Sequence, residues 1–440
     1  MGLAEEKVKK YLDKIEKENG KINAVLHLNP NALKEAREID EKVSKTGKKG
    51  RLYGYVVGVK SNINVFGLIC NCASKTLEDY KATYDATVIE KIKAEDGVII
   101  GMLNMDEFAC GSSGENSAFA CAINPKAPER VPGGSSSGSA SAVAAGFCDM
   151  TLGSDTGCSI RTPASNCGII GVKPSYGLVS RYGLIDLGMS LDQIGPISNN
   201  VKDAALLLDV IRGKDEKDTM SVDSQPIEIK DLKKVKVGIL KIKNIDTRIQ
   251  KIVEQKISEI IGNYGWDANN VEIDYIELAV QTYYPLVYAE FFSGTRRFDG
   301  RRYGKKIEDS CGPEVLRRIL GGSEITKAEF SGRYYNKALE IKEMIKEEFK
   351  KVFEKYDCIL SPVVPGIPWK VGEGLKMKPE EVYAYDACTI PANLAGICAM
   401  SIPAGFAKEG KEEIPIGLQI MCGNGQESKM FSIAKMIEDL

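Results

Sequence analysis

Two stretches rich in glycine and serine lie in the first half of the chain and most constrain its fold. The first is GGSSSGS at residues 133–139, and the second is SDTGCSIRTPAS at residues 154–165. Such runs commonly form flexible linkers. Here, however, the first run leads directly into a small-residue helix, ASAVAAGF, and then a strand, CDMTLG. Because a linker does not normally sit between core elements joined so tightly, we predict that both stretches are ordered loops of one α/β core.

The elements around these stretches also predict an α/β fold. Apolar spacing predicts helices over residues 4–20, 31–46, 86–95, 246–263 and most of 310–356, and strands over 53–60, 97–103, 234–242 and 271–277. Apolar strands return after residue 357 in DCILSPVVP, AMSIPAGF and IGLQIMC. We find no repeat and no clean linker. We therefore predict one domain over residues 1–440, composed of N-terminal helices (1–50), a core (51–200), an α/β and helical middle region (201–356) and a C-terminal return to the sheet (357–440).

Charge and cysteine usage argue against several classes of protein. The chain has 59 Lys and Arg against 61 Asp and Glu, a formal net charge of −2, whereas dedicated nucleic-acid binders are usually basic. None of its 12 cysteines is spaced as CxxC, the spacing of zinc ribbons and thioredoxin-like motifs. No run of about 18 apolar residues predicts a membrane span, and the charged N-terminus lacks the apolar core of a signal peptide. We therefore expect a cytoplasmic protein with reduced thiols and no membrane contact.

The single histidine, His27, restricts the chemistry further. It excludes any metal site that needs two imidazoles, and the acidic residues lack EF-hand spacing, so we expect no metal in this chain. A Ser-His-Asp mechanism would have only this one candidate base. Lysine is the available substitute, because desolvation favours its neutral, basic form.

Lys60 ends an apolar strand, whereas most other lysines lie in charged helical stretches. Ser135 and Ser159 lie in the two Gly/Ser-rich loops, which are separated by a helix and a strand. That connection can bring both loops to one edge of a sheet, where α/β proteins commonly place their sites. Position alone leaves the alternative that Lys60 is a solvated surface lysine.

Several blocks of the sequence resemble the amidase signature family. They are VPGGSSSGSASAVAAG, LGSDTGCSIRTPASNCGIIGVKPSYGLVSRYGL, GVKSNINV, YDATVIEKIK, IIGMLNMDEFACGSSGENSAF and LDQIGPIS, with thinner matches in RRFDGRRYG, EVLRRIL, YDACTIPANLAG and PIGLQIM. The resemblance implies a central mixed β-sheet covered by helices on both faces. It further implies that Ser159 is a nucleophile and Lys60 a base, bridged by Ser135 after a cis Gly134–Ser135 bond. The oxyanion hole implied by the resemblance consists of backbone N–H groups at Thr156, Gly157 and Cys158.

The resemblance also implies three substrate-binding residues. Arg318 in VLRRIL matches a carboxylate-binding arginine, Asp386 in YDACTIP matches a residue that holds an α-ammonium group, and Tyr283 matches a tyrosine beside the substrate. Each has a simpler alternative interpretation, for example a solvated helix charge for Arg318 and a core aromatic for Tyr283.

Within the family, the chain resembles the glutaminase subunits of tRNA-dependent amidotransferases, in the short form found in archaea. This implies a heterotrimer in which a B subunit binds the mischarged Glu-tRNA(Gln) and uses ATP and Mg²⁺. A small C subunit braces the pair, and this chain, without a cofactor of its own, releases ammonia from glutamine. Two alternatives stay open: a stand-alone amidase and a catalytically weakened scaffold subunit. The choice between Glu-tRNA(Gln), Asp-tRNA(Asn) or both also stays open, because it lies with the partner.

The chain departs from the family pattern next to the nucleophile. Most relatives read TGGS there, whereas this chain reads TGCS, so Cys158 stands where glycine is usual. Glycine permits backbone angles that are costly for other residues. Either the conformation is one that cysteine accepts, or the oxyanion loop is perturbed; cysteine as the nucleophile is a less favoured interpretation. Asp155, Arg161 and Asp106 are expected to be structural, and His27 to have no catalytic role.

Overall fold

The computed structural model describes residues 2–440 and contains one mixed sheet of 11 strands in the order β1-β3-β2-β4-β6-β5-β10-β11-β9-β7-β8. The parallel pairs are β2–β3, β2–β4, β7–β8 and β7–β9, and the remaining neighbours are antiparallel. The strands are β1 Val25–Leu28, β2 Val56–Lys60, β3 Val98–Leu103, β4 Met150–Asp155, β5 Ile170–Lys173, β6 Gln193–Ser198, β7 Lys236–Leu240, β8 Asp267–Val271, β9 Cys358–Pro362, β10 Cys398–Glu409 and β11 Glu412–Cys422. The predicted α/β class with a mixed central sheet is confirmed.

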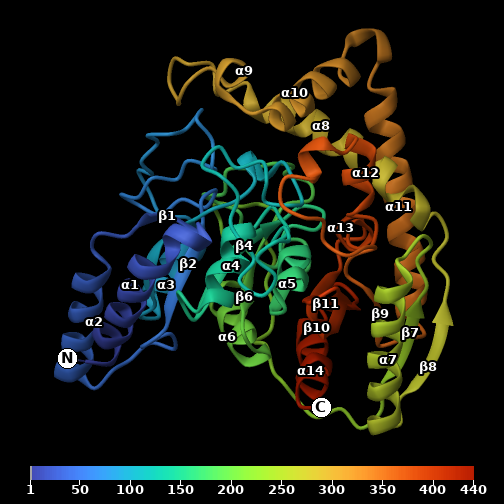
Figure 1. Cartoon of the computed structure of the whole chain (residues 1–440), viewed down its shortest axis with the longest axis horizontal. Helices are drawn as coiled ribbons and strands as arrows, with labels where there is room; N and C mark the ends of the chain where they lie inside the picture. The colour runs from blue at the N-terminus through green and yellow to red at the C-terminus, as the bar shows by residue number, and fades with distance from the viewer. Residues whose placement is uncertain (1) are drawn as a thin grey trace.

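Helices pack on both faces of this sheet (Figure 1). They are α1 Leu3–Ile22, α2 Ala32–Thr46, α3 Thr87–Ala94, α4 Ser137–Ala145, α5 Arg161–Cys167, α6 Val201–Ile211, α7 Thr247–Tyr264, α8 Ala279–Thr295, α9 Ile307–Ser310, α10 Pro313–Ile325, α11 Arg333–Phe353, α12 Pro379–Ala384, α13 Ile390–Leu394 and α14 Glu427–Glu438. Short 3₁₀ turns occur at Glu107–Ala109, Ile276–Leu278, Ala328–Phe330 and Gly374–Lys376.

The strands carry apolar side chains toward both faces, as expected for a sheet buried on two sides. In β2, Val57 and Val59 join the apolar core under α3, α6, α7 and α14, whereas Val56 joins the core under α1, α2, α4 and α5. In β9, Ile359 faces a third core, beneath α8, α10, α11 and α13. Figure 1 shows α8, α10 and α11 grouped at one side of the molecule.

The first Gly/Ser run is an ordered core segment, as predicted, because residues 133–139 are all buried. The end of this run forms the first turn of α4, whose small side chains permit close packing. A Cβ on Gly138 would lie 2.4 Å from the backbone nitrogen of Asn104, so only glycine fits there. This close packing places the start of α4 beside Asn104, which directly follows β3.

The predicted strand over residues 271–277 is wrong. The strand in this region is β8 Asp267–Val271, and residues 276–278 form a 3₁₀ turn. β8 is an edge strand that pairs only with β7, and most of its side chains reach solvent. Its sequence, DANNV, therefore lacks the apolar signal by which buried strands are recognised. The single-domain division of the chain stays a prediction.

Candidate active site

Lys60 lies at the end of β2 with its amine fully buried. Its Nζ is 2.7 Å from Ser135 Oγ, 2.9 Å from Ser154 Oγ and 3.2 Å from the Ser154 carbonyl oxygen. Burial lowers the pKa of Lys60 to about 8, against the opposing attraction of nearby carboxylates such as Asp106. Lys60 is therefore no surface lysine, and a substantial fraction of it is neutral at mildly alkaline pH.

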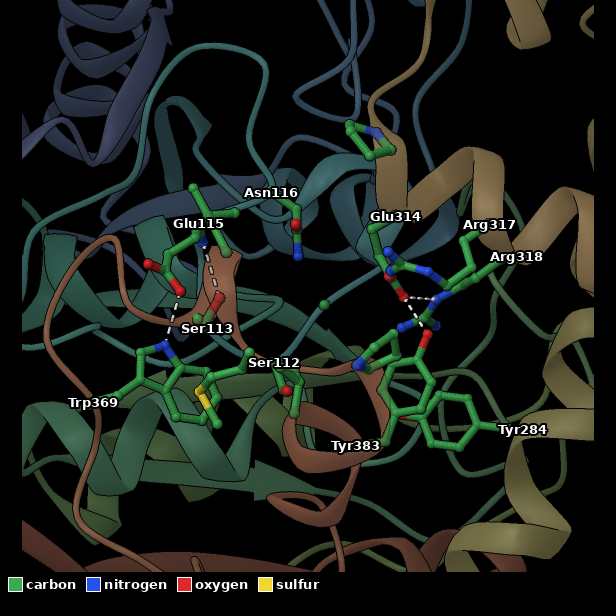
Figure 2. Close-up of a pocket in the computed structure, with 17 residues that line it drawn as sticks. Ser112, Ser113, Glu115, Asn116, Tyr284, Glu314, Arg317, Arg318, Trp369 and Tyr383 are labelled. Carbon is green, nitrogen blue, oxygen red and sulfur yellow. Dashed lines mark hydrogen bonds and ion pairs between the residues drawn. The ribbon is translucent and has the colours of Figure 1, made fainter.

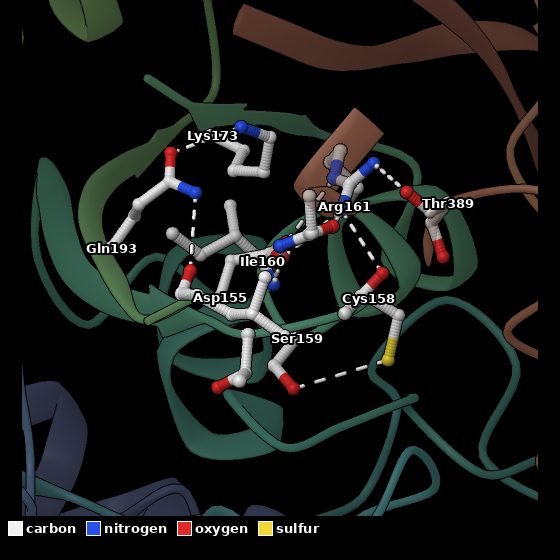
Figure 3. A network of polar contacts seen from close by, with 12 residues as sticks. Asp155, Cys158, Ser159, Ile160, Arg161, Lys173, Gln193 and Thr389 are labelled. Atoms are coloured by element: carbon white, nitrogen blue, oxygen red, sulfur yellow. Dashed lines mark hydrogen bonds and ion pairs between the residues drawn. The ribbon is translucent and has the colours of Figure 1, made fainter. Parts of the chain in front are cut away.

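Ser135 and Ser159 come from the two Gly/Ser-rich loops, which meet as predicted. The backbone N–H of Ser136 donates to the Ser159 carbonyl oxygen at 3.1 Å, and the Gly134–Ser135 peptide is cis. Ser159 Oγ lies 3.9 Å from Cys158 Sγ (Figure 3). Across residues 2–440 we find no hydrogen bond between Ser135 Oγ and Ser159 Oγ. The structure thus joins Lys60 to Ser135 and brings the Ser159 loop beside them.

The loop before Ser159 presents free backbone donors. No described residue accepts a hydrogen bond from the buried backbone N–H of Gly157 or Cys158. Such groups are rarely left unpaired in folded proteins. Thr156, which precedes them, is anchored by its hydroxyl, which donates to Asp192 Oδ1 at 2.6 Å. A Cβ on Gly157 would lie 2.9 Å from Tyr283 Cζ, so the aromatic ring packs directly on this loop.

Cys158 fits its position without the backbone angles reserved for glycine. It is not among the described non-glycine residues with positive φ. Its thiol donates toward the Gly134 carbonyl oxygen at 3.6 Å. Burial, reinforced by the charge of Asp386, raises the pKa of this thiol well above its ordinary value. A thiol that stays protonated is a poor nucleophile, so the site favours Ser159.

A buried ion pair between Arg161 and Asp155 stabilises the loop that carries Ser159. The Arg161 guanidinium contacts both carboxylate oxygens of Asp155, at 3.2 and 3.0 Å, and donates to the Gly157 carbonyl oxygen at 3.0 Å (Figure 3). It also reaches the Thr389 carbonyl oxygen and Gln419 Oε1, each at 2.8 Å. Burial raises the pKa of Asp155, but the Arg161 charge outweighs it, and the net pKa lies below the ordinary value. The geometry is that of a scaffold, as expected.

A cavity of about 410 Å³ opens beside the site, and Arg318 in α10 lines it (Figure 2). Arg318 is 4% exposed, so it is not a solvated helix charge. Its Nε donates to Glu314 Oε1 at 2.9 Å, while no described residue hydrogen-bonds its two terminal nitrogens. Tyr383 donates to the same Glu314 oxygen at 2.9 Å. The carboxylate of Glu314 therefore holds the guanidinium in place and leaves its outer edge free.

Asp386 and Tyr283 are buried between this cavity and the Ser159 loop. Tyr284, which lines the cavity, donates its hydroxyl to Asp386 Oδ2 at 3.2 Å. Asp386 Oδ1 has no partner among the described residues. Burial raises the pKa of Asp386 to about 6. Tyr283 belongs to the apolar core beneath α8 and at the same time covers Gly157.

The side chains of Asp106 and His27 make their hydrogen bonds outside the group formed by Lys60, Ser135 and Ser159. Asp106 accepts hydrogen bonds from the backbone of Gly114 and Asn116, both at 2.9 Å, and therefore shapes a loop. His27 lies in β1 with Nε2 3.1 Å from Asn71 Nδ2. The backbone N–H of Asp106 also donates to the Ser135 carbonyl oxygen at 3.1 Å. His27 makes no direct hydrogen bond to Lys60, Ser135 or Ser159 in the described part of the chain.

Sequence reasoning missed several side chains of the site. They are Ser154 beside Lys60, Tyr284 beside Asp386, and Glu314 beside Arg318. Glu314 had a usable signal, because it lies four residues before Arg318 on one helix and such pairs face each other. Ser154 had none, because serine is common in the surrounding loop.

Two kinds of feature are absent from residues 2–440. No cluster of three or more His, Cys, Asp or Glu is placed to hold a metal ion. No helix in the same range is long and apolar enough to cross a membrane.

Comparison with known proteins assigns the family. The Amidase family model matches residues 6–431. The chain is 51% identical to the A subunit of glutamyl-tRNA(Gln) amidotransferase from Methanocaldococcus jannaschii over 430 residues, which are 97% of each chain. It is 48% identical to the corresponding protein of Methanothermobacter thermautotrophicus, covering 99% of this chain and 96% of that one.

A solved structure of a family member also superposes on this chain. The crystal structure of the glutamyl-tRNA(Gln) amidotransferase A subunit from Thermotoga maritima superposes with a TM-score of 0.84 at 38% identity, covering 99% of this chain and 91% of that one. The resemblance to the archaeal form is confirmed by the two methanogen relatives. The protein therefore belongs to the amidase signature family.

Proposed function

We propose that this chain is the glutaminase subunit of a tRNA-dependent amidotransferase. The observation that carries the proposal is the 2.7 Å contact of a fully buried lysine, Lys60, with Ser135, beside a nucleophile loop with free N–H groups. The extent of identity to glutamyl-tRNA(Gln) amidotransferase A subunits supports the choice of glutamine as the amide.

The proposed chemistry begins with neutral Lys60, which takes a proton from Ser135 as Ser135 takes one from Ser159. Ser159 Oγ turns from the Cys158 thiol toward Ser135 and attacks the carboxamide carbon of glutamine. The C–N bond then breaks, the proton returns through Ser135 to the leaving nitrogen, and ammonia departs. Water hydrolyses the glutamyl ester to glutamate and restores Ser159.

The backbone N–H groups at residues 156–158 supply the second element of the chemistry. They would bind the oxygen that becomes negative when Ser159 attacks. A donor held in this way contributes roughly 3 kcal/mol to the transition state. Cys158 serves here through its backbone, which explains why a side chain is tolerated.

The two charged ends of glutamine match two unpartnered groups. The free edge of Arg318 would pair with the α-carboxylate through two parallel hydrogen bonds, and Asp386 Oδ1 would accept one from the α-ammonium group. Tyr283 would form the wall between them and the Ser159 loop. A free amino acid is thus favoured over an amide without charged ends.

The partners are part of the same proposal. A B subunit would bind Glu-tRNA(Gln), activate its γ-carboxyl group with ATP and Mg²⁺, and accept the ammonia, and a C subunit would brace the pair. The names of the relatives support a multi-subunit enzyme. This chain contributes the glutamine site and no cofactor.

Ammonia release tests the proposal. We would measure it from glutamine with the chain alone, and then with the B and C subunits, ATP and Glu-tRNA(Gln). We expect strong stimulation by the complete system, and loss of at least about a hundredfold in kcat for Ser159→Ala and Lys60→Ala.

Three other outcomes would contradict the proposal. Partner-independent turnover of other amides would identify a stand-alone amidase. Complex formation without turnover would identify a scaffold subunit. Near-normal glutaminase activity in either variant would reject the assigned nucleophile or base.

A further inference from the structure

The second hydrogen-bond partner of Lys60, besides Ser135, is Ser154, the penultimate residue of β4. Both oxygens of Ser154 face Lys60 Nζ, the hydroxyl at 2.9 Å and the carbonyl at 3.2 Å. A carbonyl oxygen can only accept, so one N–H of Lys60 points at it. The direction of the bond to the Ser154 hydroxyl depends on the other neighbours of that hydroxyl, because a hydroxyl can donate or accept.

The side-chain amide of Asn62 is the other neighbour of the Ser154 hydroxyl. Its Nδ2 is 3.1 Å from Ser154 Oγ and 3.4 Å from the Ile185 carbonyl oxygen. Because this carbonyl can only accept, the amide must turn its NH₂ group toward Ile185 and Ser154. Ser154 Oγ therefore receives a hydrogen bond from Asn62 and keeps a second lone pair that can accept an N–H of Lys60. Both Asn62 and Ser154 are 2% exposed, so water does not compete.

The number of N–H hydrogens on neutral Lys60 then limits how its amine group can be oriented. Neutral lysine has two N–H hydrogens and one lone pair. If both hydrogens go to the two Ser154 oxygens, the lone pair is left for the remaining neighbour, Ser135 Oγ at 2.7 Å. We propose that Ser154, oriented by Asn62, is a positioning residue that aims the lone pair of Lys60 at Ser135. The inference rests on the proposed role of Lys60 as base and adds the groups that orient it.

The decisive variants are Ser154→Ala and Ser154→Thr, tested in the full chain assembled with its partner subunits. Alanine removes the acceptor, so the lone pair of Lys60 is no longer held on Ser135. We expect kcat for glutamine hydrolysis to fall roughly ten- to hundredfold, with KM changed less than about twofold because Ser154 does not line the Arg318 cavity. Threonine keeps the hydroxyl and should restore most of kcat.

The pH profile separates positioning from a general loss of packing. The ammonium form of Lys60 gains more from the Ser154 acceptor than the neutral form does. Ser154→Ala should therefore move the acid limb of kcat/KM to lower pH, and Ser154→Thr should not. The titratable groups that face Lys60, namely Asp106, Asp155, Asp192 and Cys158, are unchanged in both variants.

A double-mutant cycle tests the part played by Asn62. Asn62→Ala should lower kcat with little change in KM, and adding it to Ser154→Ala should cause almost no further loss, because Asn62 acts through Ser154. Ser139→Ala is the matched control. Its hydroxyl donates to the Leu152 carbonyl oxygen at 3.2 Å in the same buried layer, and the variant should keep normal activity.

Three results would overturn the inference: a Ser154→Ala enzyme with normal kcat and pH profile, a threonine variant as impaired as alanine, or losses for Asn62 and Ser154 that multiply. Circular dichroism confirms folding in each case. If the Ser154→Ala protein does not fold, the kcat of Asn62→Ala tests the inference. A normal kcat in that variant also overturns it. Failure of the proposed function is distinguishable, because it requires activity in Lys60→Ala or Ser159→Ala.

Discussion

Lys60 is the residue whose protonation state controls the proposed chemistry. A lysine in water keeps its proton near neutrality, and burial lowers the pKa of Lys60 to about 8. Because the base must be neutral, we expect kcat/KM for glutamine to rise with pH through about 8 and then level. A pH–rate profile between 6 and about 9.5 checks this. An acid limb governed by a group near 6.5, the ordinary value for histidine, would contradict it.

Cys158 is the departure from the family pattern that the structure explains. Its φ is not positive, and its thiol donates to the Gly134 carbonyl oxygen. We therefore expect Cys158→Gly to change glutaminase kcat by less than about threefold. The variant should lose about 1 kcal/mol of stability, since glycine is more flexible in the unfolded chain. Activity assays and urea unfolding measure the two effects, and a tenfold gain in kcat would show that cysteine compromises the site.

Arg318 is the residue that we expect to bind the carboxylate of the substrate. Arg318→Ala should raise KM for glutamine roughly ten- to hundredfold, since a charge-assisted pair is worth roughly 1.5–3 kcal/mol. The neighbouring Arg317 is the matched control, because it also lines the cavity and pairs with Glu314 but is the more exposed of the two. Arg317→Ala should have a clearly smaller effect on KM. Equal KM values for the two variants would argue against a carboxylate site at Arg318.

At the scale of elements, the unit α4–β4–α5 holds both serine loops, and Arg161 fixes it. Arg161→Ala would leave the buried carboxylate of Asp155 unpaired, which typically costs 3–5 kcal/mol. We expect a loss of stability of about that size in urea unfolding. Arg248→Ala is the control, because Arg248 pairs with Asp246 and Glu409 at the surface, where such pairs contribute less than about 1 kcal/mol. Similar losses in both variants would disprove the scaffold role.

Elements with a strong apolar pattern were recognisable from sequence, and edge elements were not. β2, β3, β9, β10 and β11 lie where apolar runs predicted strands. β8 was misplaced because its side chains face solvent, and β1, which contains His27, was not predicted at all. The short central strands β5 and β6 were also not predicted. An edge strand is stabilised by backbone pairing with one neighbour, and side-chain patterns do not record that pairing.

At the scale of the molecule, the single histidine lies on the first strand of the sheet, apart from the proposed proton path. β1 is one of the two edge strands and, among the residues that the structure describes, pairs only with β3, and His27 contacts Asn71. Burial lowers the pKa of His27, so it is neutral at physiological pH. His27→Ala should keep at least about half of the glutaminase activity, as measured by ammonia release. Loss of activity with an intact fold would give this residue a role in catalysis.

The α/β class, the order of most elements, and the residues that match the family could all be predicted from the sequence: Lys60, the two serine loops, Arg318 and Asp386. Those signals are local, because they depend on apolar periodicity and on short blocks of neighbouring residues. The folded structure was needed to show which polar groups stand unpaired beside the nucleophile, why cysteine fits at residue 158, and that Ser154 contacts both Lys60 and Asn62. These are contacts between elements distant in sequence, and the distances and burial that determine their chemistry exist only once the sheet has formed.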